Sequence, residues 1–150
     1  MNFRIDVLLP APAESIWLVF FDVRRIALLI PGCENVVETS PLASYSAIMK
    51  QKIGPFRIDV PTQIVVEERE EPRRVKVHAI GRDRITGTTL DVMLAVALES
   101  TPASGTRLAV DATLQVAGRL ASLGYPVVKK KSEELFAEFE KRLRAELGIA

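Results

Sequence analysis

The chain has one histidine and one cysteine, the residue types that most often bind transition metals or act as nucleophiles. His78 alternates with Arg74 and Lys76 on the polar side of a strand-like segment, so we expect it to face solvent. Cys33 follows a turn glycine with no histidine near it in sequence, so we interpret it as a small buried hydrophobic residue. A zinc site needs three or four such ligands. The sequence therefore predicts neither a metal site nor a cofactor.

Two carboxylates, Asp91 and Asp111, are the candidates for acid–base catalysis. Each stands in an alternating segment on the side opposite its strongly apolar residues, so we expect both to face solvent. A general base must lie within hydrogen-bond reach of the proton that it removes, and no spacing in the chain fixes a pair of carboxylates. We therefore predict no catalytic residue and a protein that is not an enzyme.

Lys129–Lys131 is the most basic run of the chain. Consecutive helical residues fan out around the helix, so these three lysines do not form one face. Together with Arg119 and Lys141 they would attract an anionic membrane weakly, and glutamates later in the same helix oppose that attraction. We favour a solvated helix, with weak peripheral contact at the inner face of a membrane as the alternative.

Composition narrows the class of protein. The 150 residues are 48% hydrophobic and 26% charged, which predicts one domain over residues 1–150 with its own core. The net charge of +1, with both signs interspersed, does not indicate a nucleic-acid partner. No apolar run reaches the ~18 residues that span a bilayer. The first residues lack the order of a secretory signal and the lone cysteine suits a reducing compartment, so we expect a cytoplasmic protein.

Apolar periodicity predicts the elements. Residues 2–9 alternate as a strand, and two short helices follow, the first beginning near Pro12 and the second over 23–30 with Asp22 as its N-cap. A helical period returns over 119–147, where Pro126 predicts a kink or a broken first turn. Between the helices the period is two, and short turns between strands imply an antiparallel meander. The strand candidates there are 34–39, 43–53, 56–69, 73–81, 86–99 and 106–117.

This order of elements predicts an α+β fold. A sheet of seven strands has an apolar face too large to leave in water, and the last helix is the only element long enough to cover it. We therefore expect a helix-grip (START/Bet v1-like) fold, in which a curved seven-stranded antiparallel sheet wraps around a long C-terminal helix. Such an arrangement often leaves a cavity under the helix, where a small ligand binds.

The chain resembles the CoxG family (the G subunit of carbon monoxide dehydrogenase) of the START-like (SRPBCC) helix-grip superfamily over nearly its whole length. The resemblance is densest in Ile30-Pro31-Gly32-Cys33-Glu34, in Lys52-Ile53-Gly54-Pro55-Phe56, and in Gly105-Thr106-Arg107-Leu108 followed by 116–124. Ala117 departs from the family pattern, since a glycine is usual there. The resemblance implies an accessory protein of a molybdenum carbon monoxide dehydrogenase-type system, which recruits the enzyme or handles a quinone-like apolar partner.

We therefore predict non-catalytic binding of an apolar small molecule, lipid- or quinone-like, between the sheet and the C-terminal helix. One alternative is a helix-grip enzyme, such as a cyclase or hydratase, which needs an ionisable group inside the cavity. Another is a protein-interaction module with a filled core. Tyr125 is predicted to supply a polar handle near the mouth of the site. The residues predicted to line it are Trp17, Phe20, Ile30, Met49, Leu94, Leu114, Leu120 and Leu123.

Overall fold

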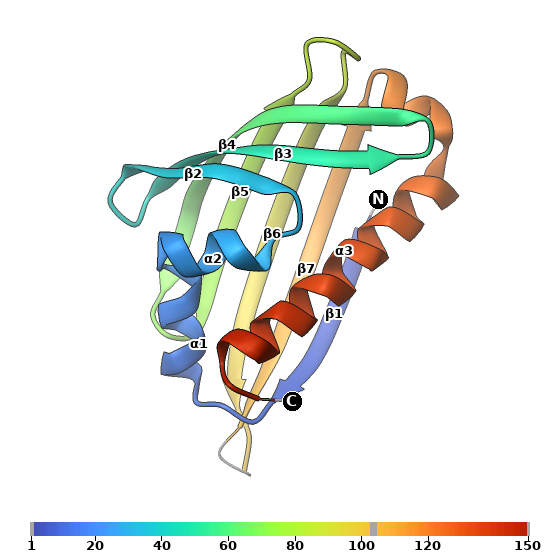
Figure 1. Ribbon diagram of the computed structural model, residues 1–150. Helices are drawn as coiled ribbons and strands as arrows, with labels where there is room; N and C mark the ends of the chain where they lie inside the picture. The colour runs from blue at the N-terminus through green and yellow to red at the C-terminus, as the bar shows by residue number, and fades with distance from the viewer. Residues whose placement is uncertain (1, 103–104, 150) are drawn as a thin grey trace.

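The computed structural model describes residues 2–102 and 105–149, and it follows the predicted order of strands and helices. A strand and two short helices come first, six strands follow, and a long helix ends the chain (Figure 1). The elements are β1 (Asn2–Leu9), α1 (Ala13–Phe20), α2 (Val23–Leu29), β2 (Cys33–Ser40), β3 (Ser44–Ile53), β4 (Phe56–Glu70), β5 (Arg74–Arg82), β6 (Thr89–Ser100), β7 (Thr106–Ala117), the 3-10 helix η1 (Arg119–Leu123) and α3 (Tyr125–Glu146).

The seven strands form one antiparallel sheet in the order β1-β7-β6-β5-β4-β3-β2. Every strand except β1 pairs with the strand that follows or precedes it in sequence. β1 pairs with β7 instead, because the α1–α2 pair carries the chain from one edge of the sheet to the other. The sheet curves so that β2, β3 and β4 arch over its inner side, while α3 crosses that side diagonally (Figure 1). The predicted helix-grip arrangement is thereby confirmed.

Local signals in the sequence set where the helices begin. Pro12 is the N-cap of α1, and the Asp22 carboxylate accepts a hydrogen bond from the backbone N–H of Arg25 at 3.4 Å, as expected of the N-cap of α2. The predicted helix over 119–147 is two helices. Gly124, with φ +87°, separates η1 from α3, and Pro126 lies in the first turn of α3, where its missing N–H costs nothing.

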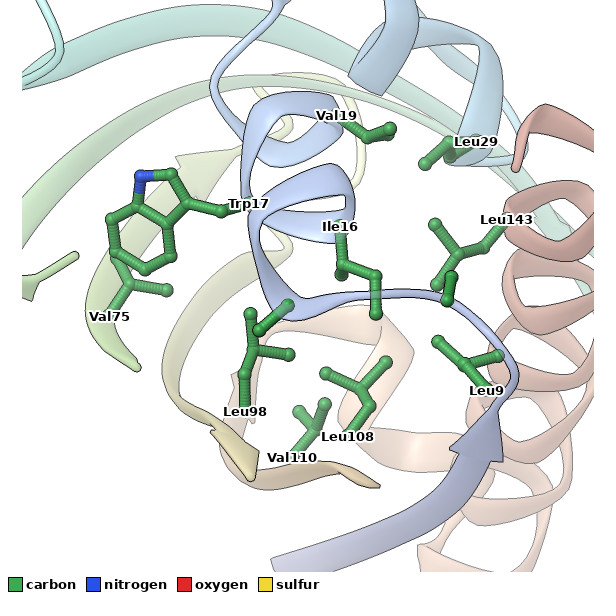
Figure 2. Packing of buried hydrophobic residues seen from close by; sticks show 12 residues of the cluster. Leu9, Ile16, Trp17, Val19, Leu29, Val75, Leu98, Leu108, Val110 and Leu143 are labelled. Carbon is green, nitrogen blue, oxygen red and sulfur yellow. The ribbon is translucent and has the colours of Figure 1, made fainter. Parts of the chain in front are cut away.

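The main core lies at one end of the sheet, under α1 and α2. Ile16 and Val19 of α1, Leu29 of α2 and Leu143 of α3 converge there on Leu98, Leu108 and Val110 of the sheet (Figure 2). Trp17 extends from α1 in a different direction from Val19 and packs toward Val75 of β5 (Figure 2). The C-terminal half of α3 is therefore fixed by apolar packing, and Arg25 adds an ion pair to Glu146 at 2.6 Å between α2 and α3.

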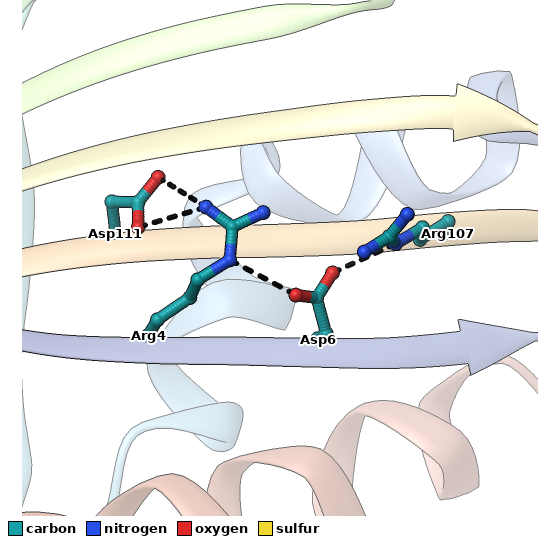
Figure 3. A network of polar contacts seen from close by, with 4 residues as sticks. All are labelled: Arg4, Asp6, Arg107 and Asp111. Carbon is teal, nitrogen blue, oxygen red and sulfur yellow. Dashed lines mark hydrogen bonds and ion pairs between the residues drawn. The ribbon is translucent and has the colours of Figure 1, made fainter.

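The outer face of the sheet is polar and charged. Arg4 joins Asp6 and Asp111 at 3.0 Å, and Asp6 also pairs with Arg107 at 2.8 Å, so four alternating charges connect β1 and β7 (Figure 3). Hydrogen bonds from Arg107 and then Arg4 hold the pKa of Asp6 below its usual range. All four side chains lie in solvent, so the network helps to hold the edge strand in register and stabilises the fold little.

Candidate ligand-binding site

The inner face of the sheet carries two separate buried clusters. The first is the main core under α1 and α2. The second lies at the opposite end, where Ile53, Ile58 and Val60 of the β3–β4 hairpin pack on Leu120 of η1. The segment from β7 to α3 covers this second end because η1 turns the chain back over the sheet (Figure 1).

Between the two clusters runs a cross-strand row of inner-face residues, called here the central row. Strand register aligns Tyr45 with Ile64, Ile64 with Ala79, Ala79 with Val92, and Val92 with Leu114. Tyr45 is buried, but the other four side chains are only half-buried and belong to neither cluster. The middle of the inner face is therefore an apolar surface that solvent still reaches.

Helix α3 passes over this region. Val128 and Leu143 are its buried residues, and Leu135 lies between them on the same helical face but is only half-buried. Beside this face, a groove of about 370 Å³ opens between α3 and the edge strand β1. Its volume falls in the range of about 300–1,000 Å³ that small-molecule sites occupy.

The groove has an apolar floor and a charged rim. Phe3 and Ile5 of β1 face Phe136 of α3, and the Phe3 and Phe136 rings lie 6.4 Å apart between centroids. Lys129 and Glu133 stand on the rim and pair at 3.8 Å. This arrangement suits a ligand with an apolar body and a polar end that stays near water.

Tyr45 adds a polar atom to the buried side of the central row. It is 8% exposed, and among the described residues its hydroxyl makes no hydrogen bond of ordinary length, although the Glu38 carboxylate lies close enough to interact with it. Burial, and then the nearby charge of Glu38, raise the pKa of Tyr45, so the hydroxyl stays protonated at neutral pH. Buried hydroxyls are normally hydrogen-bonded, which makes Tyr45 an uncommon feature of this face.

The nine residues predicted to form the site are spread over the whole inner side. Leu114 lies in the central row, and Ile30 is half-buried in the turn after α2. Tyr125 is 52% exposed at the start of α3. Trp17, Phe20 and Leu94 belong to or pack against the first cluster, and Met49, Leu120 and Leu123 do so for the second.

Sequence reasoning missed the residues that line the groove. Phe3 and Ile5 alternate in the first strand, and Phe136 stands one position after Leu135 in the last helix, so each has an apolar pattern. The pattern alone does not say that β1 becomes an edge strand beside α3. That placement follows from the crossover through α1 and α2.

The histidine and the two aspartates lie on the outer face of the sheet, as the sequence predicts, whereas Cys33, predicted to be buried, is only half-buried. His78, Asp91 and Asp111 are on the outer face, and His78 lies between two carboxylates, 2.8 Å from Asp91 and 3.4 Å from Glu67. Cys33 is half-buried, and burial followed by the charge of Glu34 raises its pKa, which keeps the thiol protonated. Among the described residues no group of histidine, cysteine and carboxylate side chains is arranged to hold a metal ion.

A curved antiparallel sheet around a long C-terminal helix, with an accessible apolar inner face, defines the class of START-like helix-grip proteins. Solved structures confirm this fold. A conserved protein from Geobacillus kaustophilus superposes with a TM-score of 0.90 at 18% identity, over 99% of this chain and 95% of that one. A START superfamily protein from Mycobacterium smegmatis superposes with a TM-score of 0.73 at 14% identity, over 98% and 97%.

Within that class, the family model for CoxG, the G subunit of carbon monoxide dehydrogenase, matches residues 6–148, so the chain belongs to the CoxG family. The family resemblance seen in the sequence is thus confirmed. No curated protein matches the chain by sequence. Across residues 2–102 and 105–149, no helix combines the length and the apolar character needed to cross a bilayer.

Proposed function

We propose that this CoxG-family protein binds an apolar small molecule, lipid- or quinone-like, between the sheet and α3 without transforming it. It would serve as an accessory protein of a molybdenum carbon monoxide dehydrogenase-type system. The observation that carries the proposal is the central row, where Ile64, Ala79, Val92 and Leu114 remain half-buried between two packed clusters. An apolar surface left accessible inside a fold gains free energy when an apolar ligand covers it.

The composition of the inner face supports binding without catalysis. The central row and the two rows beside it carry no aspartate, glutamate, histidine, lysine or arginine. Proton transfer needs an ionisable group within reach of the substrate, and the charged groups closest to the groove stand on its solvent-exposed rim. The site can therefore hold and release an apolar molecule but offers little to activate it.

Family membership supports the proposed accessory role, because the CoxG family is named for a subunit of carbon monoxide dehydrogenase. It is tested by expressing the chain with a molybdenum dehydrogenase of the same organism and asking whether the two co-purify. A complex in size-exclusion chromatography is expected. Separate elution at micromolar concentration of both proteins would contradict an accessory role.

Ligand binding is tested first with the purified protein. Native mass spectrometry and organic-solvent extraction should find a co-purified lipid or isoprenoid quinone. Thermal unfolding with short-chain ubiquinone, menaquinone and a phospholipid panel should show a rise in melting temperature, because a ligand that binds only the folded state stabilises it by mass action. No bound molecule and no shift with any member of the panel would refute the proposal.

A matched pair of variants locates the site. Ala79→Phe puts a bulky side chain into the central row on β5, and Ala95→Phe makes the same change on the outer face of β6. Ala79→Phe is expected to abolish the ligand-induced shift, whereas Ala95→Phe should leave it unchanged. Equal loss in both variants, or binding that survives Ala79→Phe, would place the ligand elsewhere.

A further inference from the structure

The sheet has two edge strands, and they differ in how well they are protected against pairing. β2, at one edge, shifts register twice against β3 and holds Asn35 at φ +52°. Such irregularities keep an edge strand from accepting another strand. β1, at the other edge, pairs all eight of its residues with β7 without a shift, and it contains no proline or glycine. The side of β1 that faces away from β7, called here the β1 edge, is therefore a regular template for one more strand.

Backbone groups of an antiparallel strand point toward its neighbour and away from it at alternate residues. The Leu8 carbonyl points away from β7, because it accepts a hydrogen bond from Nη2 of Arg144 in α3 at 3.1 Å. The alternation then turns the backbone N–H and C=O groups of Arg4 and Asp6 outward as well. Within the described part of the chain, no backbone or side-chain group bonds to these outward groups of Arg4 and Asp6. The β1 edge thus offers donors and acceptors for a ladder of main-chain hydrogen bonds.

The charges of β1 set which strand fits this edge. Arg4 and Asp6 point to the outer face of the sheet, where they pair with each other at 3.0 Å and with Asp111 and Arg107 of β7. Residues directly opposite each other in neighbouring strands attract when their charges differ and repel when they agree. An antiparallel strand with a basic residue opposite Asp6 and an acidic residue opposite Arg4 complements both charges.

The α3–β1 groove leaves room beside the β1 edge. Phe3 and Ile5 of β1, both half-buried, form its apolar floor together with Phe136 of α3, and the small, exposed Ala137 lines the same groove. Every second side chain of an added strand would point to this inner side. An apolar residue opposite Ile5 would remove apolar surface from water there. The groove therefore favours a strand whose inward residues are apolar.

A single strand fits the β1 edge better than a second copy of the chain. α3 runs along β1, since the Phe136 ring lies 6.4 Å from the Phe3 ring and Arg144 reaches Leu8. Two copies joined β1 to β1 would place both α3 helices on the same side of one continuous sheet. Neighbouring strands lie about 4.8 Å apart, but packed helices need about 8–10 Å between their axes. An isolated peptide strand brings no second helix into this space.

We propose that the β1 edge binds an extended peptide segment of a partner protein, which joins the seven-stranded sheet as an additional antiparallel strand. Apolar residues of the segment face the α3–β1 groove, and between them a basic residue lies opposite Asp6 and an acidic residue opposite Arg4. Main-chain hydrogen bonds supply the affinity, while the groove and the two charges supply the selectivity. This surface is separate from the central row, so the proposal does not depend on the apolar ligand.

The first test is titration of a fluorescein-labelled peptide with the full chain. The peptide has the core Val-Lys-Val-Glu-Val with a threonine at each end, and its anisotropy should saturate with a dissociation constant below about 1 mM. N-methylation of the lysine and the glutamate removes the two N–H groups that face β1, and should weaken binding at least about tenfold. N-methylation of the first and last valines, whose N–H groups point away from β1, should leave most of the binding. No saturation by the parent peptide, or equal loss in the two methylated peptides, would overturn the proposal.

Amide hydrogen exchange, measured residue by residue by NMR, locates the added strand. In the free chain the Arg4 and Asp6 N–H groups face water and should exchange fast, whereas the Phe3 and Ile5 N–H groups bond to β7 and should exchange slowly. The peptide should slow exchange at Arg4 and Asp6 at least about tenfold. Binding that leaves these two amides unprotected would place the peptide elsewhere and refute the assignment.

Variants with matched controls test the groove and the edge. Ala137→Trp fills the groove and should weaken peptide binding at least about tenfold, whereas Ala145→Trp, at an exposed position about two turns later on α3, should not. Asp6→Pro removes an outward N–H, which an edge strand tolerates, and should abolish binding. Asp6→Ala keeps that N–H and should weaken binding only about two- to fivefold. Equal losses within the α3 pair overturn the proposal, and that pair decides the question if Asp6→Pro does not fold.

Two further outcomes separate this proposal from its neighbours. A concentration-dependent dimer in analytical ultracentrifugation that Ala137→Trp abolishes would overturn the peptide in favour of a second copy of the chain. The quinone-induced rise in melting temperature is measured independently on the wild-type chain. A chain that shows this rise but binds no peptide refutes the β1 edge alone, and a chain that binds the peptide without the rise refutes the ligand proposal alone.

Discussion

Replacing Asp83 with asparagine tests whether one buried carboxylate organises the β5–β6 loop. Asp83 accepts three backbone hydrogen bonds, from Asp59 at one carboxylate oxygen and from Ile85 and Thr86 at the other. Asparagine keeps one acceptor oxygen but presents an amide donor where the second oxygen stood. At least one backbone N–H then faces the amide donor instead of an acceptor inside a buried site. The substitution therefore removes a hydrogen bond and leaves that N–H without a partner.

The size of the expected stability loss follows from this exchange of an acceptor oxygen for an amide donor. A hydrogen bond to a charged group contributes about 1.5–3 kcal/mol, and a buried group left without a partner loses its full desolvation cost. We expect Asp83→Asn to lower the free energy of unfolding by about 2–3 kcal/mol at pH 7. For a chain of this length, each kcal/mol corresponds to about 2–4 °C, so the melting temperature should fall by about 4–12 °C.

The Asp83 carboxylate also makes the stability difference between wild type and Asp83→Asn depend on pH. Burial raises the pKa of Asp83, but the hydrogen bonds from Asp59, Ile85 and Thr86 together outweigh it and leave the pKa below the ordinary value of 3.8. A carboxylate with a lowered pKa in the folded state contributes its stability above the unfolded value and loses it as pH falls through the folded value. The gap between wild type and Asp83→Asn should thus be constant from pH 7 to about pH 5 and should shrink below about pH 4.

Urea unfolding of both proteins between pH 7 and pH 3, followed by circular dichroism, measures that gap. Asp59→Asn changes an exposed carboxylate on the neighbouring strand and serves as the control. The interpretation of Asp83 as the organiser of the loop is refuted if Asp83→Asn is as stable as wild type at pH 7. It is refuted equally if the gap does not narrow in acid.

Two further substitutions test the core and the central row. Leu143→Ala removes a fully buried side chain from the packing of α3 on α1 and α2, and should lower the free energy of unfolding by about 2–5 kcal/mol. The exposed Leu18→Ala should change it little, and a cost below about 1 kcal/mol for Leu143→Ala in urea titration would mean that α3 is not seated there. Tyr45→Phe removes a buried hydroxyl that lacks a partner, and should raise the free energy of unfolding by up to about 1 kcal/mol. If Tyr45→Phe instead lowers the free energy of unfolding by a similar amount, the Glu38 carboxylate accepts a hydrogen bond from Tyr45.

Secondary structure was largely predictable from this sequence because its signals are local. The predicted strands 2–9 and 106–117 match β1 and β7 residue for residue. Their alternation is regular because one face packs against apolar neighbours and the other meets water. The Gly124–Pro126 break divided the predicted last helix in two, since Gly124 adopts a positive φ that favours glycine.

The site was less predictable than the fold. An apolar inward residue has the same pattern whether it closes a packed core, as Trp17 and Leu120 do, or lines an accessible surface, as Val92 and Leu114 do. Which of these it becomes depends on how the elements above it sit. Here α1 and α2 cover one end and η1 covers the other, so the middle row is left half-buried.

The sequence by itself determined the order of elements, the inward and outward faces of each strand, and the family, because periodicity and family motifs reside in neighbouring residues. The tertiary structure alone decided the groove beside β1, the anchoring of the β5–β6 loop by Asp83 and the meeting of the β5–β6 loop, η1 and the start of α3 at one end of the sheet. In the sequence, Lys129–Lys131 is a short run whose charges fan around a helix. In the fold the start of α3 lies at the same end of the sheet as the β5–β6 loop, because curvature of the sheet and the turn through η1 bring together segments that lie tens of residues apart.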